Sequence, residues 1–96
     1  MASEPTTAFD AAEYLDSPEA ITAYLADAMT DPDPSELIHA LGVIARAKGM
    51  TQIAEQSGLA RPALYRALTH DSRPEYATVI KVMRALGIEL QPVVAG

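Results

Sequence analysis

Two arginines in the second half of the chain, Arg61 and Arg66, are the side chains best suited to recognise another molecule. A guanidinium group can span the O6 and N7 acceptors of guanine with two hydrogen bonds, so a helix that presents both arginines would suit the major groove of DNA. Small polar residues at the start of the preceding helix would suit backbone phosphates. The predicted DNA contacts are Thr51, Gln52, Arg61, Pro62, Tyr65, Arg66 and Thr69, flanked by Arg46, Lys48, Arg73 and Lys81. The alternative is that both arginines are ordinary solvated residues on a compact helical bundle.

No other set of residues in the sequence points to catalysis or to a metal. The chain has no Cys, which removes thiolate ligands, cysteine nucleophiles and disulfides together. His39 and His70 are 31 positions apart, and Glu36 with His39 is one ligand pair where a carboxylate-bridged metal site needs several. The serines have no neighbouring base to activate them. The sequence therefore predicts neither an enzyme nor a bound cofactor or metal.

The residues between Met50 and Thr69 are spaced as in a helix-turn-helix, in which two helices cross over a turn of about three or four residues. The first helix needs a residue no larger than Ala where the second approaches, and Ala54 is that residue. Gly58 then tolerates the positive φ that the turn requires. Ala60 is a poor N-cap for the second helix, which costs about 1 kcal/mol and predicts modest DNA affinity. The inner faces of the two helices are expected to meet through Ile53, Ser57, Leu59, Leu64 and Ala67.

Helix-start signals and apolar residues at helical spacing predict an all-α fold of about five to six helices. The expected helices are residues 17–29, 33–48, 51–57 with Thr51 as cap, 61–69 and 75–86. The last of these is expected to bury Tyr76, Val79, Ile80, Met83 and Leu86. Alternating apolar and polar residues from Ile88 to Gln91 predict a short edge strand before Pro92. The chain is thus expected to comprise a flexible tail over 1–8, an acidic helical segment over 9–32 and a helix-turn-helix domain over 33–96.

The charge of the chain is divided between its two halves. Residues 1–45 hold nine acidic residues and neither Lys nor Arg, a sum of −9, whereas residues 46–96 hold all seven bases against four acids, a sum of +3. Such an asymmetry suggests two kinds of partner, although an acidic face that only aids solubility is an open alternative. No apolar run approaches the ~20 residues of a membrane span, and the amino terminus lacks the features of a secretion signal. We therefore expect a cytoplasmic protein.

Several segments together resemble the addiction-module antidote proteins, antitoxins related to the lambda-repressor-like (XRE-like, HigA-like) helix-turn-helix group. The resemblance covers Phe9 to about Gln91 and is carried by residues 9–15, 24–25, 48–54, 58–59, 64–68, 77–79 and 85–87. Two departures are Ala60, where the family has Ser, and Ser72-Arg73, where it commonly has Gly-Asn. The resemblance implies a lambda-repressor-like bundle that neutralises a small basic toxin of the RelE/ParE type and represses the shared operon as a dimer.

An acidic segment can occupy the basic surface with which such a toxin grips RNA. We expect residues 9–36 to supply this segment, with apolar anchors inside an acidic rim. The expected toxin-binding residues are Phe9, Asp10, Glu13, Tyr14, Leu15, Asp16 and Glu19. A homodimer through the last helix and the Ile88–Val94 edge is also expected, because one recognition helix covers few base pairs. The alternatives are a standalone DNA-binding regulator, or a helix-turn-helix fold used only for protein interaction.

Overall fold

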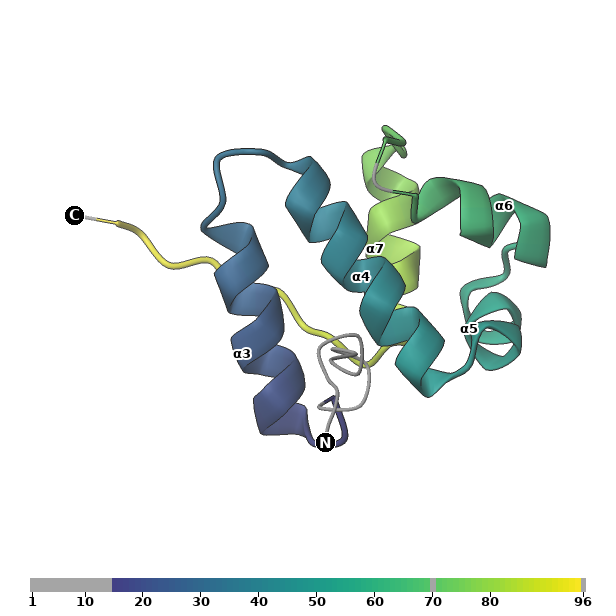
Figure 1. The fold of residues 1–96 in the computed structure, drawn as a ribbon, viewed down its shortest axis with the longest axis horizontal. Helices are drawn as coiled ribbons and strands as arrows, with labels where there is room; N and C mark the ends of the chain where they lie inside the picture. The colour runs from purple at the N-terminus through teal and green to yellow at the C-terminus, as the bar shows by residue number, and fades with distance from the viewer. Residues whose placement is uncertain (1–14, 70, 96) are drawn as a thin grey trace, which may run out of the picture.

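The structure is a computed structural model, which describes residues 15–69 and 71–95 of the chain. Five helices make up these two ranges: α3 (Pro18–Met29), α4 (Ser35–Lys48), α5 (Met50–Ser57), α6 (Arg61–Ala67) and α7 (Tyr76–Ala85). Figure 1 shows α3 and α4 side by side, α5 and α6 at the opposite end of the molecule, and α7 behind α4. The predicted all-α bundle is confirmed. The tail expected over residues 1–8 lies outside the described residues.

The core forms where α4 meets the other helices. Its largest fully buried side chains are Leu41, Ile44, Ile53, Leu64 and Val82. The central helix α4 is buried along an unbroken run from Ala40 to Ala45, because helices pack on more than one of its sides. By contrast, α3 has one buried residue, Leu25, and docks on α4 through a single face. The opposite face of α3 is therefore left to solvent.

Local chemistry sets the helix ends, largely as the sequence predicts. The Ser17 hydroxyl caps α3 by accepting a hydrogen bond from the Ala20 amide at 3.1 Å. The Asp33 carboxylate accepts from the Ser35 amide at 2.9 Å and so holds the first turn of α4. Gly49 and Gly58 end α4 and α5 with φ of 105° and 78°, a region that favours glycine. These glycines lie in the short links at which the chain changes direction between α4, α5 and α6.

Three local predictions are corrected by the structure. Tyr76 is 78% exposed, because it lies in the first turn of α7, about two turns before the buried Met83, where the described chain does not cover it. Thr51 is the second residue of α5 and does not cap it, because the helix already begins at Met50. The segment from Ile88 to Gln91 forms no strand with any described residue, since the elements beside it are helices and offer no ladder to pair with. No described helix is long and apolar enough to cross a membrane.

Candidate functional site

Helices α5 and α6 are joined by a three-residue turn, Gly58-Leu59-Ala60, that brings their inner faces together. Gly58 adopts the left-handed conformation, φ 78° and ψ 10°, and its amide donates to the Ala54 carbonyl at 3.0 Å. Ser57 braces the turn, because its hydroxyl accepts from the Leu59 amide at 3.3 Å. Ala54 is buried at 6% exposure, as a close helix crossing requires. The predicted positive φ of Gly58 is confirmed, and Ala54 is buried as its predicted role requires.

The outer face of α6 carries the residues that the sequence nominates for recognition. Leu64 is fully buried, which turns Arg61, Pro62, Tyr65 and Arg66 toward solvent. The Arg61 guanidinium lies over the Tyr65 ring, 5.8 Å from its centroid, and its Nη2 is 3.5 Å from the Tyr65 hydroxyl. This contact restricts the motion of the Arg61 side chain and keeps its guanidinium group at the surface.

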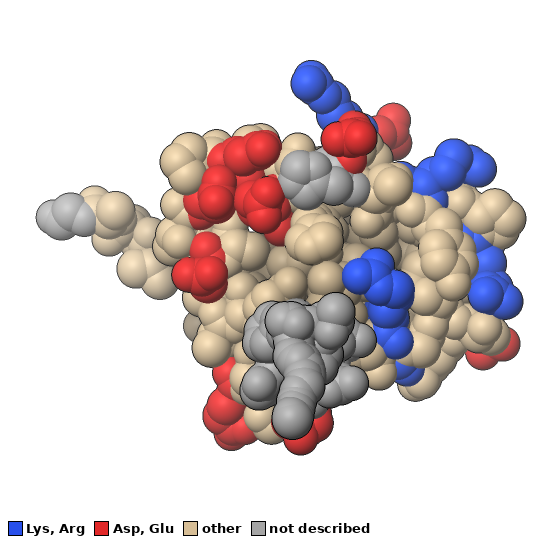
Figure 2. Space-filling view, in the orientation of Figure 1, with Lys and Arg blue, Asp and Glu red and all other residues tan. Residues whose placement is uncertain are grey.

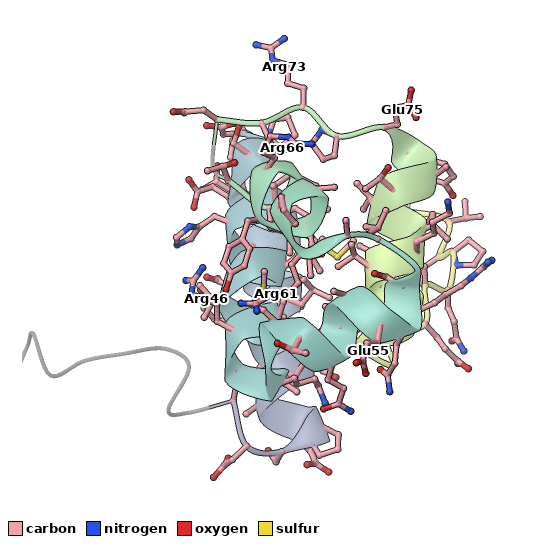
Figure 3. The ribbon with its side chains drawn as sticks, turned by 90° about the vertical axis from the view of Figure 1, so that its right-hand side faces the viewer. Arg46, Glu55, Arg61, Arg66, Arg73 and Glu75 are labelled. Atoms are coloured by element: carbon pink, nitrogen blue, oxygen red, sulfur yellow. The ribbon has the colours of Figure 1, made fainter. Side chains whose placement is uncertain are left out.

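The other predicted contact residues surround this face. Thr51 and Gln52 are exposed in the first turn of α5, and Thr69 is exposed after α6, where its hydroxyl donates to the Arg66 carbonyl at 2.6 Å. Figure 3 shows Arg46, Arg61 and Arg66 on the same face of the molecule, with Arg73 projecting from the loop that follows α6. Glu55 lies on α5, which also faces the viewer in this figure, whereas Glu75 lies at the upper edge, where α7 begins. All seven nominated DNA-contact residues are thus solvent-accessible and come from neighbouring elements.

Charge is segregated across the described surface. Figure 2 shows Asp and Glu gathered over α3 and the loop into α4 on the left, and Lys and Arg over α6 and the end of α4 on the right. The acidic side includes the exposed residues Asp16, Glu19, Asp27, Asp31 and Asp33. A few acids, such as Glu55, also lie on the basic side. Two surfaces of opposite sign on opposite sides can attract different partners at the same time.

Three of the seven predicted toxin-binding residues, Leu15, Asp16 and Glu19, lie in the described part of the chain. Asp16 and Glu19 are exposed at the start of α3, whereas Leu15 is 7% exposed and packs in the core cluster. Phe9, Asp10, Glu13 and Tyr14 lie outside the described residues. Among described residues, no three His, Asp or Glu side chains gather closely enough to hold a metal ion.

Tyr24 links the acidic helix α3 to α4. Burial raises the pKa of the Tyr24 hydroxyl above its usual value; the nearby Arg46 opposes this shift and Glu36 adds to it. The shift therefore affects the protonation of Tyr24 only in alkaline solution, since an ordinary tyrosine is also protonated at neutral pH. Its ring packs against the core cluster, so its role in the described fold is to hold α3 against α4.

Gly42 is a positioning residue that the sequence reasoning missed. A Cβ atom built at this position would lie 2.9 Å from the carbonyl oxygen of Leu68, the residue that ends α6. Only glycine therefore lets the end of α6 approach α4 this closely. The sequence does offer one signal, because Gly42 lies inside a segment with helical spacing. A glycine there makes the helix about 1 kcal/mol less stable than an alanine would, which suggests that another element packs closely against it.

Comparisons with known proteins cover nearly the whole chain. A family model described as "Probable addiction module antidote protein" matches residues 5–94. A protein of Haemophilus influenzae, described as uncharacterized, is 45% identical over 83 residues, which are 86% of this chain and 86% of that protein. No solved structure is significantly similar. The family match therefore includes both the acidic helix α3 and the α5–α6 pair.

Proposed function

Because this chain belongs to the probable addiction module antidote family, we propose that it is the antitoxin of a two-protein module and neutralises a small basic toxin of the RelE/ParE type by binding it directly. Direct binding needs a surface complementary to a protein that grips RNA, and such a surface must be acidic. The exposed acids of α3 and of the loop after it provide one. Electrostatic attraction between the two proteins would speed their encounter and favour the toxin over neutral partners.

We further propose that α5 and α6 act as a DNA-binding helix-turn-helix through which the protein represses its own operon. In this proposal α6 enters the major groove by its amino-terminal end, and Arg61 and Arg66 read base edges. Thr51 and Gln52 contact phosphates, with Arg46 and Arg73 beside them. The observation that supports this proposal best is the exposure of every nominated side chain around a buried Leu64. Contact by Pro62, Tyr65 and Thr69 would complete the footprint.

A homodimer is proposed to bind the operator, because one seven-residue helix reads too few base pairs for specificity. The face of α7 and the chain after it support this proposal. Tyr76 is 78% and Leu90 is 48% exposed, and both line a cavity of about 750 Å³. Lys81, Arg84 and Glu89 also line this cavity, so two copies related by a two-fold axis can pair opposite charges around an apolar centre.

The test of the antitoxin function is co-expression with the basic protein encoded beside this chain's gene. Growth should stop when that protein is induced alone and resume when this chain is supplied, and the two should co-purify. Purified chain should also shift the DNA upstream of its own gene at about 50 mM salt, where phosphate contacts are strong. A DNA shift without any rescue or co-purification would refute the antitoxin role and favour a standalone regulator.

A further inference from the structure

An apolar groove of about 580 Å³ runs between α3 and the chain that follows α7. One wall is a stripe on α3 at four-residue spacing, formed by Ile21, Leu25 and Met29. The other wall is the segment Leu86 to Gln91, which passes along α3 on its way to the C-terminus (Figure 1). Met29 is 52% and Leu90 is 48% exposed, although both are apolar. The groove therefore holds apolar surface that the described chain leaves in water.

Two acidic residues and one basic residue line this groove. Asp16 lines one end and Glu89 lines the second wall, while Lys48 is the single Lys or Arg among the lining residues. The rest of α3 adds Glu19 and Asp27 and has no base at all. An apolar floor inside a rim of net negative charge favours a partner segment with apolar residues at its centre and basic residues at its edges.

We propose that this groove is the toxin-docking site, and that it takes a short apolar segment of the toxin flanked by Lys or Arg; the proposal rests on the antitoxin function. The stripe from Ile21 to Met29 is about 12 Å long at 1.5 Å per residue. It matches about two turns of an amphipathic helix, or about four residues of an extended strand. The C-terminal segment 86–91 is thus part of the toxin site, which the sequence places only in residues 9–36.

A second copy of this chain is a poorer occupant of the groove. A two-fold contact would place the groove of one copy against the same groove of the other. The four acidic residues, Asp16 and Glu89 of each copy, would then outnumber the two Lys48 side chains in one interface. Like charges placed together cost stability and are a means of excluding the wrong partner. The cavity beside α7 shares the segment from Ile88 to Gln91 with this groove but adds Lys81 and Arg84, so two copies could pair opposite charges there. Charge therefore assigns the groove beside α3 to a basic partner.

A matched pair of substitutions on α3 tests the groove. Ala26 and Ala23 are both exposed on the same helix, but Ala26 lines the groove and Ala23 does not. Ala26→Arg and Ala23→Arg add the same charge to the same helix, and Arg is a good helix former. Binding to the purified basic protein encoded beside this chain's gene would be measured by calorimetry, and circular dichroism would confirm equal folding. We expect Ala26→Arg to weaken binding about thirtyfold or more. Ala23→Arg adds the same charge beside Glu19 and Asp27 but does not fill the groove, so it should weaken binding by about fivefold at most.

A variant that binds the toxin more tightly provides a second test, because misfolding would weaken binding rather than strengthen it. Lys48→Gln removes the single base of the groove and should tighten toxin binding about two- to fivefold, because it no longer repels a cationic segment. Lys48→Arg keeps the positive charge at the same place in the groove and should bind the toxin about as the wild-type chain does. Weaker binding by Lys48→Gln would contradict a cationic occupant.

The occupant itself can be identified by a photo-cross-linker placed at Thr22, an exposed residue that lines the groove. An adduct with the toxin, mapped to an apolar stretch flanked by Lys or Arg, is the expected product. An adduct between two copies, or within one chain to residues 1–14, would overturn the proposal. If the wild-type chain binds the toxin and Ala26→Arg binds it equally well, the groove assignment is wrong while the antitoxin function stands. If the wild-type chain does not bind at all, the proposed function fails as well.

Discussion

Gly42→Ala is expected to destabilise the fold by about 1 kcal/mol, although Ala is the better helix former. An Ala Cβ would lie 2.9 Å from the carbonyl oxygen of Leu68 and 3.5 Å from its Cβ. Replacing Gly by Ala inside a helix contributes about 1 kcal/mol of stability, whereas overpacking a closed site costs about 1–3 kcal/mol. The closest atom belongs to the backbone and cannot rotate away, so we expect an overpacking cost of about 2 kcal/mol. Subtracting the gain of about 1 kcal/mol in helix propensity leaves a net loss of about 1 kcal/mol.

Urea denaturation followed by circular dichroism would measure this change. A loss of about 1 kcal/mol corresponds to a melting temperature lower by about 4–8 °C for a domain of this size. Ala47→Gly, at an exposed position of the same helix, isolates the propensity effect and should also destabilise by about 1 kcal/mol. If Gly42→Ala instead stabilised the protein by the amount that Ala47→Gly destabilises it, the close approach of α6 to α4 would be refuted.

Two further predictions concern the turn and the contact between α3 and α4. Gly58→Ala should lower the unfolding free energy by about 1–2 kcal/mol, because an L-residue is disfavoured at φ 78°, although its Cβ would meet no atom within 4 Å. Gly58→Asn should lower it less in the same urea titration, because Asn tolerates this conformation better. Equal losses for the two variants would contradict a purely conformational cost. The raised pKa of Tyr24 means that, above its ordinary pKa of about 10, the folded state retains the phenol proton more than the unfolded state does. The unfolding free energy should therefore decline as pH rises from about 10, and Tyr24→Phe should reduce that decline; identical pH profiles would rule out the linkage.

The sequence was sufficient for the helices and for the exposed face of α6, because both follow from local rules. Ser17 and Gly58 act on their own neighbours, and the burial of Leu64 determines which side chains of α6 point outward. These relations span at most a few residues, so spacing alone reveals them.

Features that depend on distant parts of the chain could not be predicted in the same way. Tyr76 has the correct spacing for burial but lies beyond the described elements that could cover it. The role of Gly42 depends on Leu68, which is far away in sequence. The groove beside α3 has walls from both ends of the described chain. Helical periodicity reports which face of a helix is apolar, but it does not report which element covers that face.

The central claim is that one chain separates an acidic protein-binding side from a basic DNA-binding side. Its most direct test is the affinity of the Arg61→Ala, Arg66→Ala double variant for the upstream DNA and for the neighbouring toxin, with Arg61→Lys, Arg66→Lys as the charge-matched control. Two lost base contacts of about 1–3 kcal/mol each predict at least about thirtyfold weaker DNA binding, whereas toxin affinity should change less than about twofold. The Lys variant should keep more of the nonspecific DNA binding. Unchanged DNA affinity, or an equal loss of toxin and DNA binding, would contradict the division.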